Sequence, residues 1–467
     1  MLVVSVLLSA GCTPGRTASP GGPRLALVAA SAAVTLQRQG ASGVDLDLDV
    51  HLVADGAPLV IRAARRSYAE PVAAFRRDGG RDRALPDGLV RNFAGLPGFV
   101  RVTIADGGGA TVRTLEPTFC PGHRPVRRRP SAPGSSPYPV RCSTNPFALG
   151  AVWGIQAGWS ASVHDPVGAP VDLPPGAYRA RIEIAQRYRD LFGIPADKAS
   201  AGVALTVADG PAAAPADGSG PAAVSPLRAN PARPSGPAVV PAADRPDLRA
   251  LPAGGMSVTH DAGGDHLTFF ATVWNAGPAP LVIDGFRWEE AGAMDAYQFF
   301  LDDRGHTTGW APAGVLQWDE RDGHRHWHLA DFAAYRLLDV QYRPVADSGK
   351  TGFCLSSTDP IDLTVPGANW QPASTDLRVG CGGRTVASLR EVLDAGSGDT
   401  YRQDLPGQSF DITAVPNGDY WVEVAANPAH RLVETDLSNN VSRRPVVLGG
   451  KPGARTVLVP PYELVDS

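Results

Sequence analysis

Three histidines, His324, His326 and His328, follow one another at a spacing of two residues. If this segment is a β-strand, alternate side chains project from one face, so the three imidazoles converge without help from distant residues. Three neutral imidazoles suit copper, zinc or iron, and they leave coordination positions open for water or substrate. The chain has only 10 histidines in 467 residues. The spacing therefore predicts a metal site, although the histidines alone do not determine the metal.

Lysine is rare in this chain, and its few positions are therefore informative. Arginine supplies nearly all of the 43 basic residues, and the lysines are Lys198, Lys350 and Lys451. A lysine that falls where a particular chemistry requires one is hard to attribute to chance. The same holds to a lesser degree for tyrosine, which occurs 10 times.

Several segments in the C-terminal half resemble the lysyl oxidase family, in the order that the family has them. The histidine segment and the residues after it, 324–339, resemble the copper-binding segment of that family. Residues 349–355 are similar to the stretch around its cofactor lysine, and residues 398–401 and 408–413 to the stretch with its cofactor tyrosine. The last strands of the family are matched by residues 418–420, 427–428 and 434–441. The resemblance covers about residues 245–450 and does not extend to residues 25–208.

This resemblance implies a copper- and quinone-dependent amine oxidase. In the family, a tyrosine is oxidised near copper and captured by a lysine amine to give lysine tyrosylquinone, and Tyr401 and Lys350 are the matching positions. His324, His326 and His328 would hold the copper. The implied reaction oxidises primary amines, among them peptidyl lysine, to aldehydes with molecular oxygen and releases ammonia and hydrogen peroxide. A quinone is needed because no ordinary side chain accepts two electrons from an amine.

The base that removes a proton from the substrate is less well defined by the sequence. Asp399 lies two residues before Tyr401, on the same face of an extended segment, and suits this role. Alternatively, its carboxylate bonds the turn at residues 396–398. Asp331 is a candidate for orienting a ligand histidine, although three residues after His328 it faces the opposite side of a regular strand.

A second, calcium-binding site is expected near the end of the C-terminal half. Four residues of one short segment offer only oxygen ligands, which suit calcium: Glu434, Asp436, Asn439 and Asn440. The resemblance implies that Asp247 and the backbone of Leu248 complete this site. A solvated acidic turn is the alternative.

The elements that must position these residues are predicted to be β-strands. Alternation of apolar and polar residues predicts strands at 44–50, 98–104, 178–184 and 267–274. The 52 glycines and 44 prolines also favour turn-rich β structure. We expect an all-β protein with an N-terminal β-sandwich domain at 25–208 and a β-sandwich catalytic domain of the lysyl oxidase type at 247–452. Nine prolines among alanine, glycine and serine predict a linker at 209–246, and residues 453–467 are expected to form a tail.

Residues 1–24 are expected to be an export leader and tether. An apolar run ends at Ser9-Ala10-Gly11-Cys12, which resembles the lipidation site of bacterial lipoproteins. We therefore expect a secreted or cell-surface protein that is anchored to the membrane or cell wall through Cys12. The four remaining cysteines suggest the pairs Cys120–Cys142 and Cys354–Cys381, although other pairings are compatible with the sequence.

The overall charge favours no polyanionic partner. The formal net charge is −4, so nucleic-acid binding is not expected. The basic cluster formed by Arg124 and residues 127–129 fits an exposed loop better than a site for an anionic wall polymer. Two alternatives to the oxidase stay open: a non-catalytic metal-binding or adhesive module at the cell surface, and a zinc or iron enzyme that uses a metal-bound water.

Overall fold

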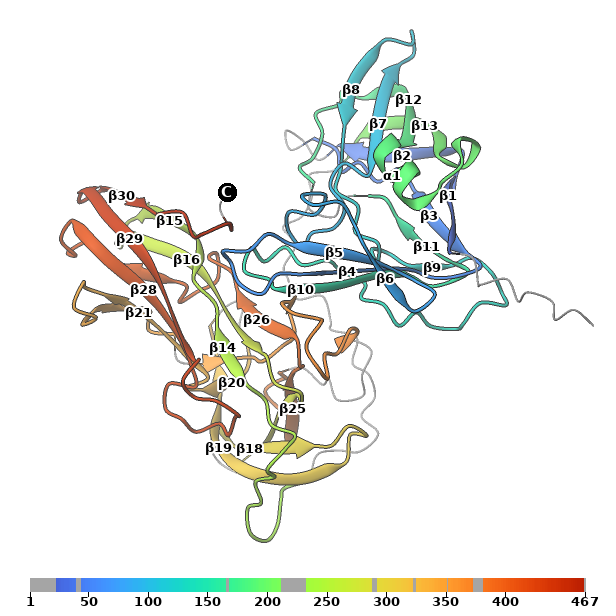
Figure 1. Cartoon of the computed structure of the whole chain (residues 1–467). Helices are drawn as coiled ribbons and strands as arrows, with labels where there is room; N and C mark the ends of the chain where they lie inside the picture. Colours follow the sequence, from blue (N-terminus) through green and yellow to red (C-terminus); the bar gives the residue numbers. More distant parts are fainter. Residues whose placement is uncertain are drawn as a thin grey trace, which may run out of the picture.

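The computed structural model describes residues 22–38, 43–164, 168–210, 232–287, 292–321, 325–350, 352–372 and 381–465. Strands dominate these residues, which confirms the expected all-β class. In Figure 1, the N-terminal strands (blue to green) occupy the upper right and the C-terminal strands (yellow-green to red) the lower left. None of the helices in the described residues has the length and hydropathy to cross a membrane.

The N-terminal half contains three sheets. The first has the order β1 (Arg24–Ala29), β3 (Val50–Asp55), β11 (Trp159–Ser162), β9 (Val126–Arg127). The second has the order β10 (Gly150–Ile155), β4 (Leu59–Ala64), β5 (Ala73–Asp78), β6 (Arg81–Ala84). The third has the order β2 (Ala33–Arg38), β13 (Ser200–Asp209), β12 (Gly176–Ile184), β7 (Val100–Asp106), β8 (Thr111–Leu115), with β2 and β13 parallel. A short helix α1 (Gln186–Phe192) and a 3₁₀ turn η2 (Ala196–Lys198) connect β12 to β13.

The C-terminal half also contains three sheets. One has the order β14 (Leu248–Ala250), β16 (Gly264–Asn275), β26 (Ser397–Tyr401), β24 (Asp359–Pro360), and β15 (Gly254–Asp261) and β27 (Ser409–Asp411) pair with β16. The next has the order β23 (Gly352–Phe353), β20 (His326–Ala330), β19 (Thr307–Asp319), β18 (Ala293–Leu301), β17 (Leu281–Arg287), β25 (Ser388–Leu393). The last has the order β22 (Pro344–Asp347), β21 (Ala333–Leu338), β28 (Gly418–Ala426), β29 (Val441–Lys451), β30 (Ala454–Leu458).

Each half has a large hydrophobic core of its own. The buried side chains of one cluster come from residues 25–207 of the sequence, and those of the other cluster from residues 248–448. Strands such as β4 bury alternate residues, as the period of two requires, whereas β3, β10 and β17 are buried along nearly their whole length. A tyrosine near the start of β12 and another near the start of β28 hold the turns before these strands in the same way. The hydroxyl of Tyr178 donates to the carbonyl of Pro174 at 2.8 Å, and that of Tyr420 to the carbonyl of Pro416 at 2.9 Å.

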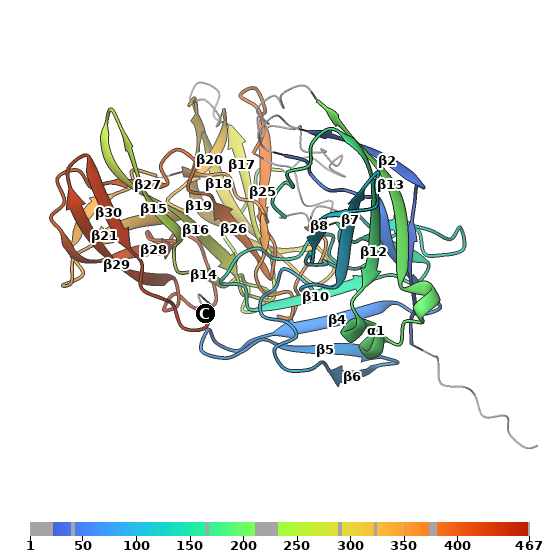
Figure 2. The same cartoon turned by 90° about the horizontal axis from the view of Figure 1, so that it is seen from above.

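A smaller apolar cluster joins the two halves. Phe147 packs in it with Leu251, Trp274 and Ile361. Backbone hydrogen bonds cross the same boundary: the carbonyl of Ile361 accepts from the amides of residues 149 and 150 at 2.7 and 3.1 Å. Both views of the chain show β10 facing the C-terminal half (Figures 1 and 2).

A buried polar contact lies beside this cluster. The side-chain amide of Asn145 donates to the hydroxyl of Thr272 at 3.0 Å. The Thr272 hydroxyl also hydrogen-bonds to that of Thr400 at 2.8 Å. Residues of the N-terminal half therefore reach the neighbour of Tyr401 through two hydrogen bonds.

Three expectations about local structure need correction. Residues 45–49 do not form a strand; Val44 makes an isolated bridge, and Asp49, with a φ of 52°, turns the chain into β3. The described part of the expected linker contacts the C-terminal half, because Val239 forms an antiparallel bridge with Trp310 of β19. The expected tail contains β30, whose strand pairing with β29 continues the last sheet. In each case a backbone conformation or a distant partner, rather than local composition, decides the structure.

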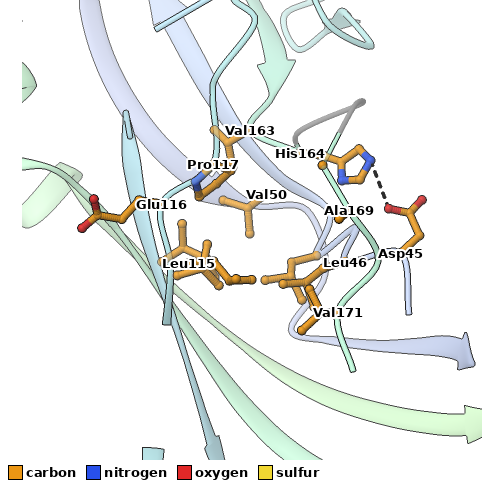
Figure 3. A pocket seen from close by; sticks show the side chains of 14 residues that line it. Asp45, Leu46, Val50, Leu115, Glu116, Pro117, Val163, His164, Ala169 and Val171 are labelled. Atoms are coloured by element: carbon orange, nitrogen blue, oxygen red, sulfur yellow. Dashed lines mark ion pairs between the residues drawn. The ribbon is translucent and has the colours of Figure 1, made fainter. Parts of the chain in front are cut away.

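An apolar pocket of about 280 Å³ opens in the N-terminal half. Leu46, Val50, Leu115 and Val171 lie around it (Figure 3). On one side, His164 and Asp45 form an ion pair at 3.4 Å. The unpaired segment 45–49 therefore contributes apolar side chains to a cavity wall rather than to a sheet.

Both expected disulfides are present, Cys120–Cys142 and Cys354–Cys381. Each closes a loop of moderate length, which contributes roughly 3 kcal/mol in a chain-entropy model. Within the arginine cluster, Arg124 pairs with Asp47, and Arg129 pairs with Asp55 at 2.6 Å. These arginines therefore hold their own loop against β3 and the segment before it.

Candidate functional site

Two of the three expected metal ligands, His326 and His328, lie in β20, which pairs with β19. His326 stands opposite Asp319, and His328 opposite Gln317. The rings of His326 and His328 have their centroids 4.6 Å apart, at an interplanar angle of 77°. The strand therefore brings these two imidazoles together as the spacing predicts. His324 lies outside the described residues, and the described residues contain no group of three or more His, Cys, Asp or Glu side chains close enough together to hold a metal ion.

The partner that orients His328 is Asp319, which the sequence analysis missed. Its Oδ2 lies 3.3 Å from Nδ1 of the buried His328 ring. A carboxylate at one ring nitrogen fixes the tautomer and leaves the other nitrogen for a metal. Asp331, the candidate considered from the sequence, instead pairs with Arg431 at 3.1 Å. The signal that could have identified Asp319 is an acidic residue at the end of the strand that precedes the histidines.

Lys350 and Tyr401 lie in contact although 51 positions separate them in the sequence. The Lys350 Nζ atom lies over the Tyr401 ring, 4.5 Å from its centroid, and 5.1 Å from that of Phe353. The Lys350 side chain is only 3% exposed, and Nζ has no hydrogen-bond partner among the described residues. A buried amine without a partner is costly, so its place beside one tyrosine face calls for a chemical explanation.

Tyr401 is held at the end of β26, which pairs with the long strand β16. Its hydroxyl donates a hydrogen bond to the carbonyl of Cys354 at 2.9 Å. Its ring meets that of Phe353 edge to face, with centroids 5.1 Å apart. The Lys350 amine lies over a face of this Tyr401 ring.

Burial shifts the acid–base properties of this cluster. Desolvation, with Arg321 in the same direction, lowers the pKa of Lys350 to about 8, while Asp399 and Asp319 act against the shift. Burial also raises the pKa of Asp399 well above its usual range, against the effects of the Tyr401 hydroxyl and the Lys350 amine. The pKa of Tyr401 is raised by burial and by the charge of Asp399. The three pKa shifts thus move each group toward its neutral form.

Asp399 lies on the same face of β26 as Tyr401, as expected for residues two apart in a strand. Its carboxyl group is buried, and its Oδ2 has no hydrogen-bond partner among the described residues. An orphan oxygen beside Tyr401 can accept a proton from a ligand that reaches this point.

The expected calcium ligands also lie together. The Asn439 amide nitrogen lies 3.1 Å from Oδ1 of Asp247 and 3.3 Å from Oδ2 of Asp436. Glu434 accepts from the backbone N–H of Leu248 at 2.8 Å. Burial raises the pKa of Glu434. The cluster ties the first strand of the C-terminal half to the segment before β29.

Comparison with known proteins agrees with this arrangement. Residues 303–454 match the sequence model of the lysyl oxidase family. Lysyl oxidase homolog 2 of Gallus gallus is 36% identical over 134 residues, which is 28% of this chain and 15% of the relative. Lysyl oxidase homolog 4 of Mus musculus is 35% identical over 133 residues, which is 28% of this chain and 16% of the relative.

These alignments define how far the relationship extends. The chain spans about one sixth of the length of the relatives it matches. The matched segment contains the histidine strand, Lys350, Asp399 and Tyr401. Residues 303–454 therefore match the lysyl oxidase family, as the resemblance in the sequence implied.

Proposed function

We propose that this protein is a copper- and lysine tyrosylquinone-dependent oxidase of primary amines. The observation that carries the proposal is the buried Lys350 amine, which lies over the face of the Tyr401 ring and has no hydrogen-bond partner among the described residues. A structural lysine would reach solvent or an acidic partner. Here the amine instead faces the ring to which it must bond.

The residues present fit both cofactors that the family implies. His326 and His328 would hold copper with His324, and Asp319 supports one of these rings at 3.3 Å. Imidazole donors suit copper, and a ring already oriented by a carboxylate binds it more tightly. Lys350 and Tyr401 would form the quinone cofactor, because they supply the amine and the phenol ring at contact distance.

When formed, the cofactor supplies a carbonyl group and a two-electron sink for amine oxidation. The chain itself supplies position, exclusion of water and proton transfer. The lowered pKa of Lys350 keeps part of its amine unprotonated and able to bond. Asp399 would take the proton from the substrate carbon next to nitrogen, since it shares the Tyr401 face of β26 and its Oδ2 has no hydrogen-bond partner among the described residues. Phe353 and Tyr335 are both fully buried and in contact with each other, and they would keep water away from the Tyr401 ring on that side.

The oxygen-rich cluster at residues 434–440 would bind calcium in a structural role. Asn439 and Asn440 each have a buried side-chain oxygen with no hydrogen-bond partner among the described residues. Two such oxygens beside Asp247 and Asp436 match the hard donors that calcium takes. A calcium-dependent rise in Tm that Asn439→Ala abolishes would support this assignment.

An oxidising location outside the cytoplasm fits the two disulfides. The proposed lipid anchor at Cys12 lies outside the described residues.

Peptide mapping by mass spectrometry tests the central proposal. The full chain is produced without copper, loaded with copper in air, digested and searched for a covalent Lys350–Tyr401 link. A joined peptide together with hydrogen peroxide release from a primary amine is the expected result. If copper-loaded, aerated protein keeps the two peptides separate, the oxidase proposal fails and a metal-binding surface module becomes the better assignment.

A further inference from the structure

A second buried carboxyl group lies near Tyr401 and has no role in the reaction described above. Glu391 lies on β25 between Leu389 and Leu393, and all three side chains are buried. Its Oε2 accepts a hydrogen bond from the N–H of Leu355 at 3.0 Å. Its Oε1 is buried and has no hydrogen-bond partner among the described residues. A leucine would avoid this unpaired oxygen, so the glutamate needs a reason.

One peptide group connects Glu391 to Tyr401. The N–H of Leu355 and the carbonyl of Cys354 belong to the same planar unit. Its carbonyl end accepts the hydroxyl of Tyr401 at 2.9 Å, and its N–H end donates to Glu391 at 3.0 Å. Because the two ends of a trans peptide point in opposite directions, holding the N–H fixes the direction of the carbonyl.

This peptide lies just beyond the end of a strand. β23 ends at Phe353, so no strand ladder includes the 354–355 peptide. The disulfide to Cys381 restrains the Cys354 side chain, but it makes no hydrogen bond to the peptide group itself. The hydrogen bond to Glu391 restrains this peptide plane from its N–H end.

The direction of the Cys354 carbonyl matters because it anchors the phenol. If the peptide turned, the Tyr401 hydroxyl would lose its acceptor inside a buried site. The ring would then lose the orientation in which its face meets the Lys350 amine.

We propose that Glu391 is a positioning residue for Tyr401 and acts through the peptide between Cys354 and Leu355. The inference rests on the proposed function, since it concerns the tyrosine that becomes the cofactor. The role requires an oxygen acceptor and no charge. Burial, with the nearby Asp399, raises the pKa of Glu391 well above its usual range, and a neutral acid still accepts through its carbonyl oxygen.

Two substitutions separate this role from simple packing. Glu391→Gln keeps an oxygen acceptor for the Leu355 N–H, whereas Glu391→Leu keeps bulk and burial but leaves that N–H unpaired. Glu423→Leu is the matched control, because Glu423 is also buried but pairs with Arg336 and Arg443 in another sheet. Each full-length variant is purified without copper, and the Lys350–Tyr401 cross-link is then followed over time after addition of copper and air.

We expect Glu391→Gln to form the cross-link within about twofold of the wild-type rate, and Glu391→Leu about tenfold more slowly, as loss of one hydrogen bond implies. The Tm of Glu391→Leu should stay near that of wild type, because the substitution also removes an unpaired oxygen. Equal rates for Glu391→Leu and wild type would overturn the inference, and so would a Glu391→Gln variant as slow as Glu391→Leu. If the wild type itself forms no cross-link, the proposed function fails, which is a separate result.

A measurement on the copper-free wild type needs no variant. Residue-resolved hydrogen exchange should show the Leu355 amide protected well beyond the amides of its loop neighbours. Exchange of this amide at the rate of an open loop would mean that Glu391 does not hold the peptide, and the inference would be wrong.

Discussion

The amine nitrogen of Lys350 lies over the face of the Tyr401 ring, 4.5 Å from its centroid. The backbone of Tyr401 is fixed by pairing of β26 with β16, and its hydroxyl by the Cys354 carbonyl. Lys350 itself follows β22 and precedes β23, and its side chain is buried. The two groups of the proposed cofactor therefore already lie in contact, and such an arrangement lowers the entropic cost of joining them.

Formation of the Lys350–Tyr401 cross-link should depend on pH through the amine. At pH 7, about a tenth of an amine with a pKa near 8 is unprotonated, against roughly one in a thousand or fewer for an ordinary lysine. We expect the rate to rise from pH 6 and to level off above about pH 9. Stopped time points analysed by mass spectrometry measure this profile. A rate that stays flat or falls between pH 6 and 9 would contradict it.

Replacing the buried amine should stabilise the copper-free protein. The pKa of Lys350 is lower in the folded chain than in the unfolded one, so the cost of burial is full below about pH 8 and disappears as pH rises toward the unfolded value. Lys350→Met should therefore raise the free energy of unfolding by up to about 3 kcal/mol at pH 6, and by much less near pH 10. Urea denaturation at both values tests this, with the exposed Lys451→Met as control. An equal gain at the two pH values would show that the amine charge is not responsible.

Asp319 should affect copper binding, whereas Asp331 should not. Asp319→Asn removes the carboxylate charge beside the His328 ring, and loss of such a partner typically lowers metal affinity about 10–100-fold. Asp331→Asn disturbs only an ion pair with Arg431. Competition titration with a copper chelator measures both affinities. Unchanged affinity in Asp319→Asn would remove Asp319 from the metal site.

Asp399→Asn should separate cofactor formation from turnover. The amide keeps the shape of the carboxyl group but cannot accept the substrate proton, so kcat/KM for a primary amine should fall about 10²–10⁴-fold. Peptide mapping should still find the cross-link. Asp359→Asn is the control, since Asp359 stands opposite Gly398 on the neighbouring strand β24. Normal turnover by cross-linked Asp399→Asn would exclude Asp399 as the base.

Wild-type activity should also carry the signature of this carboxyl group. The pKa of Asp399 is raised by burial, so its basic form appears only as pH rises well above the usual range for aspartate. Activity at low pH should therefore be lost earlier than an exposed carboxylate would predict.

Local pattern was enough to predict the groups that share one strand. His326 and His328 lie together, as do Asp399 and Tyr401, because residues two apart in a strand share a face. The contact between Lys350 and Tyr401 came from resemblance to a family, since nothing local links the two positions.

Pattern alone could not supply the partners across strands. Asp319 meets His328 because of the register of one hairpin, and register depends on the turn and on packing. Glu391 has a signal in the sequence, a glutamate between Leu389 and Leu393 at the spacing of one face. The pattern predicts a buried glutamate only when the segment is known to be a strand whose face with Leu389 and Leu393 is buried.

The shared cluster around Phe147 has a consequence for how the molecule unfolds. Separation of the two halves would expose Trp274 and Ile361 to water and break the hydrogen bond from Asn145 to Thr272. Loss of this apolar surface and of a buried hydrogen bond is unfavourable for both halves at once. Calorimetry should therefore show one cooperative melting transition, and a cut in the segment between residues 210 and 232 should leave the two pieces associated.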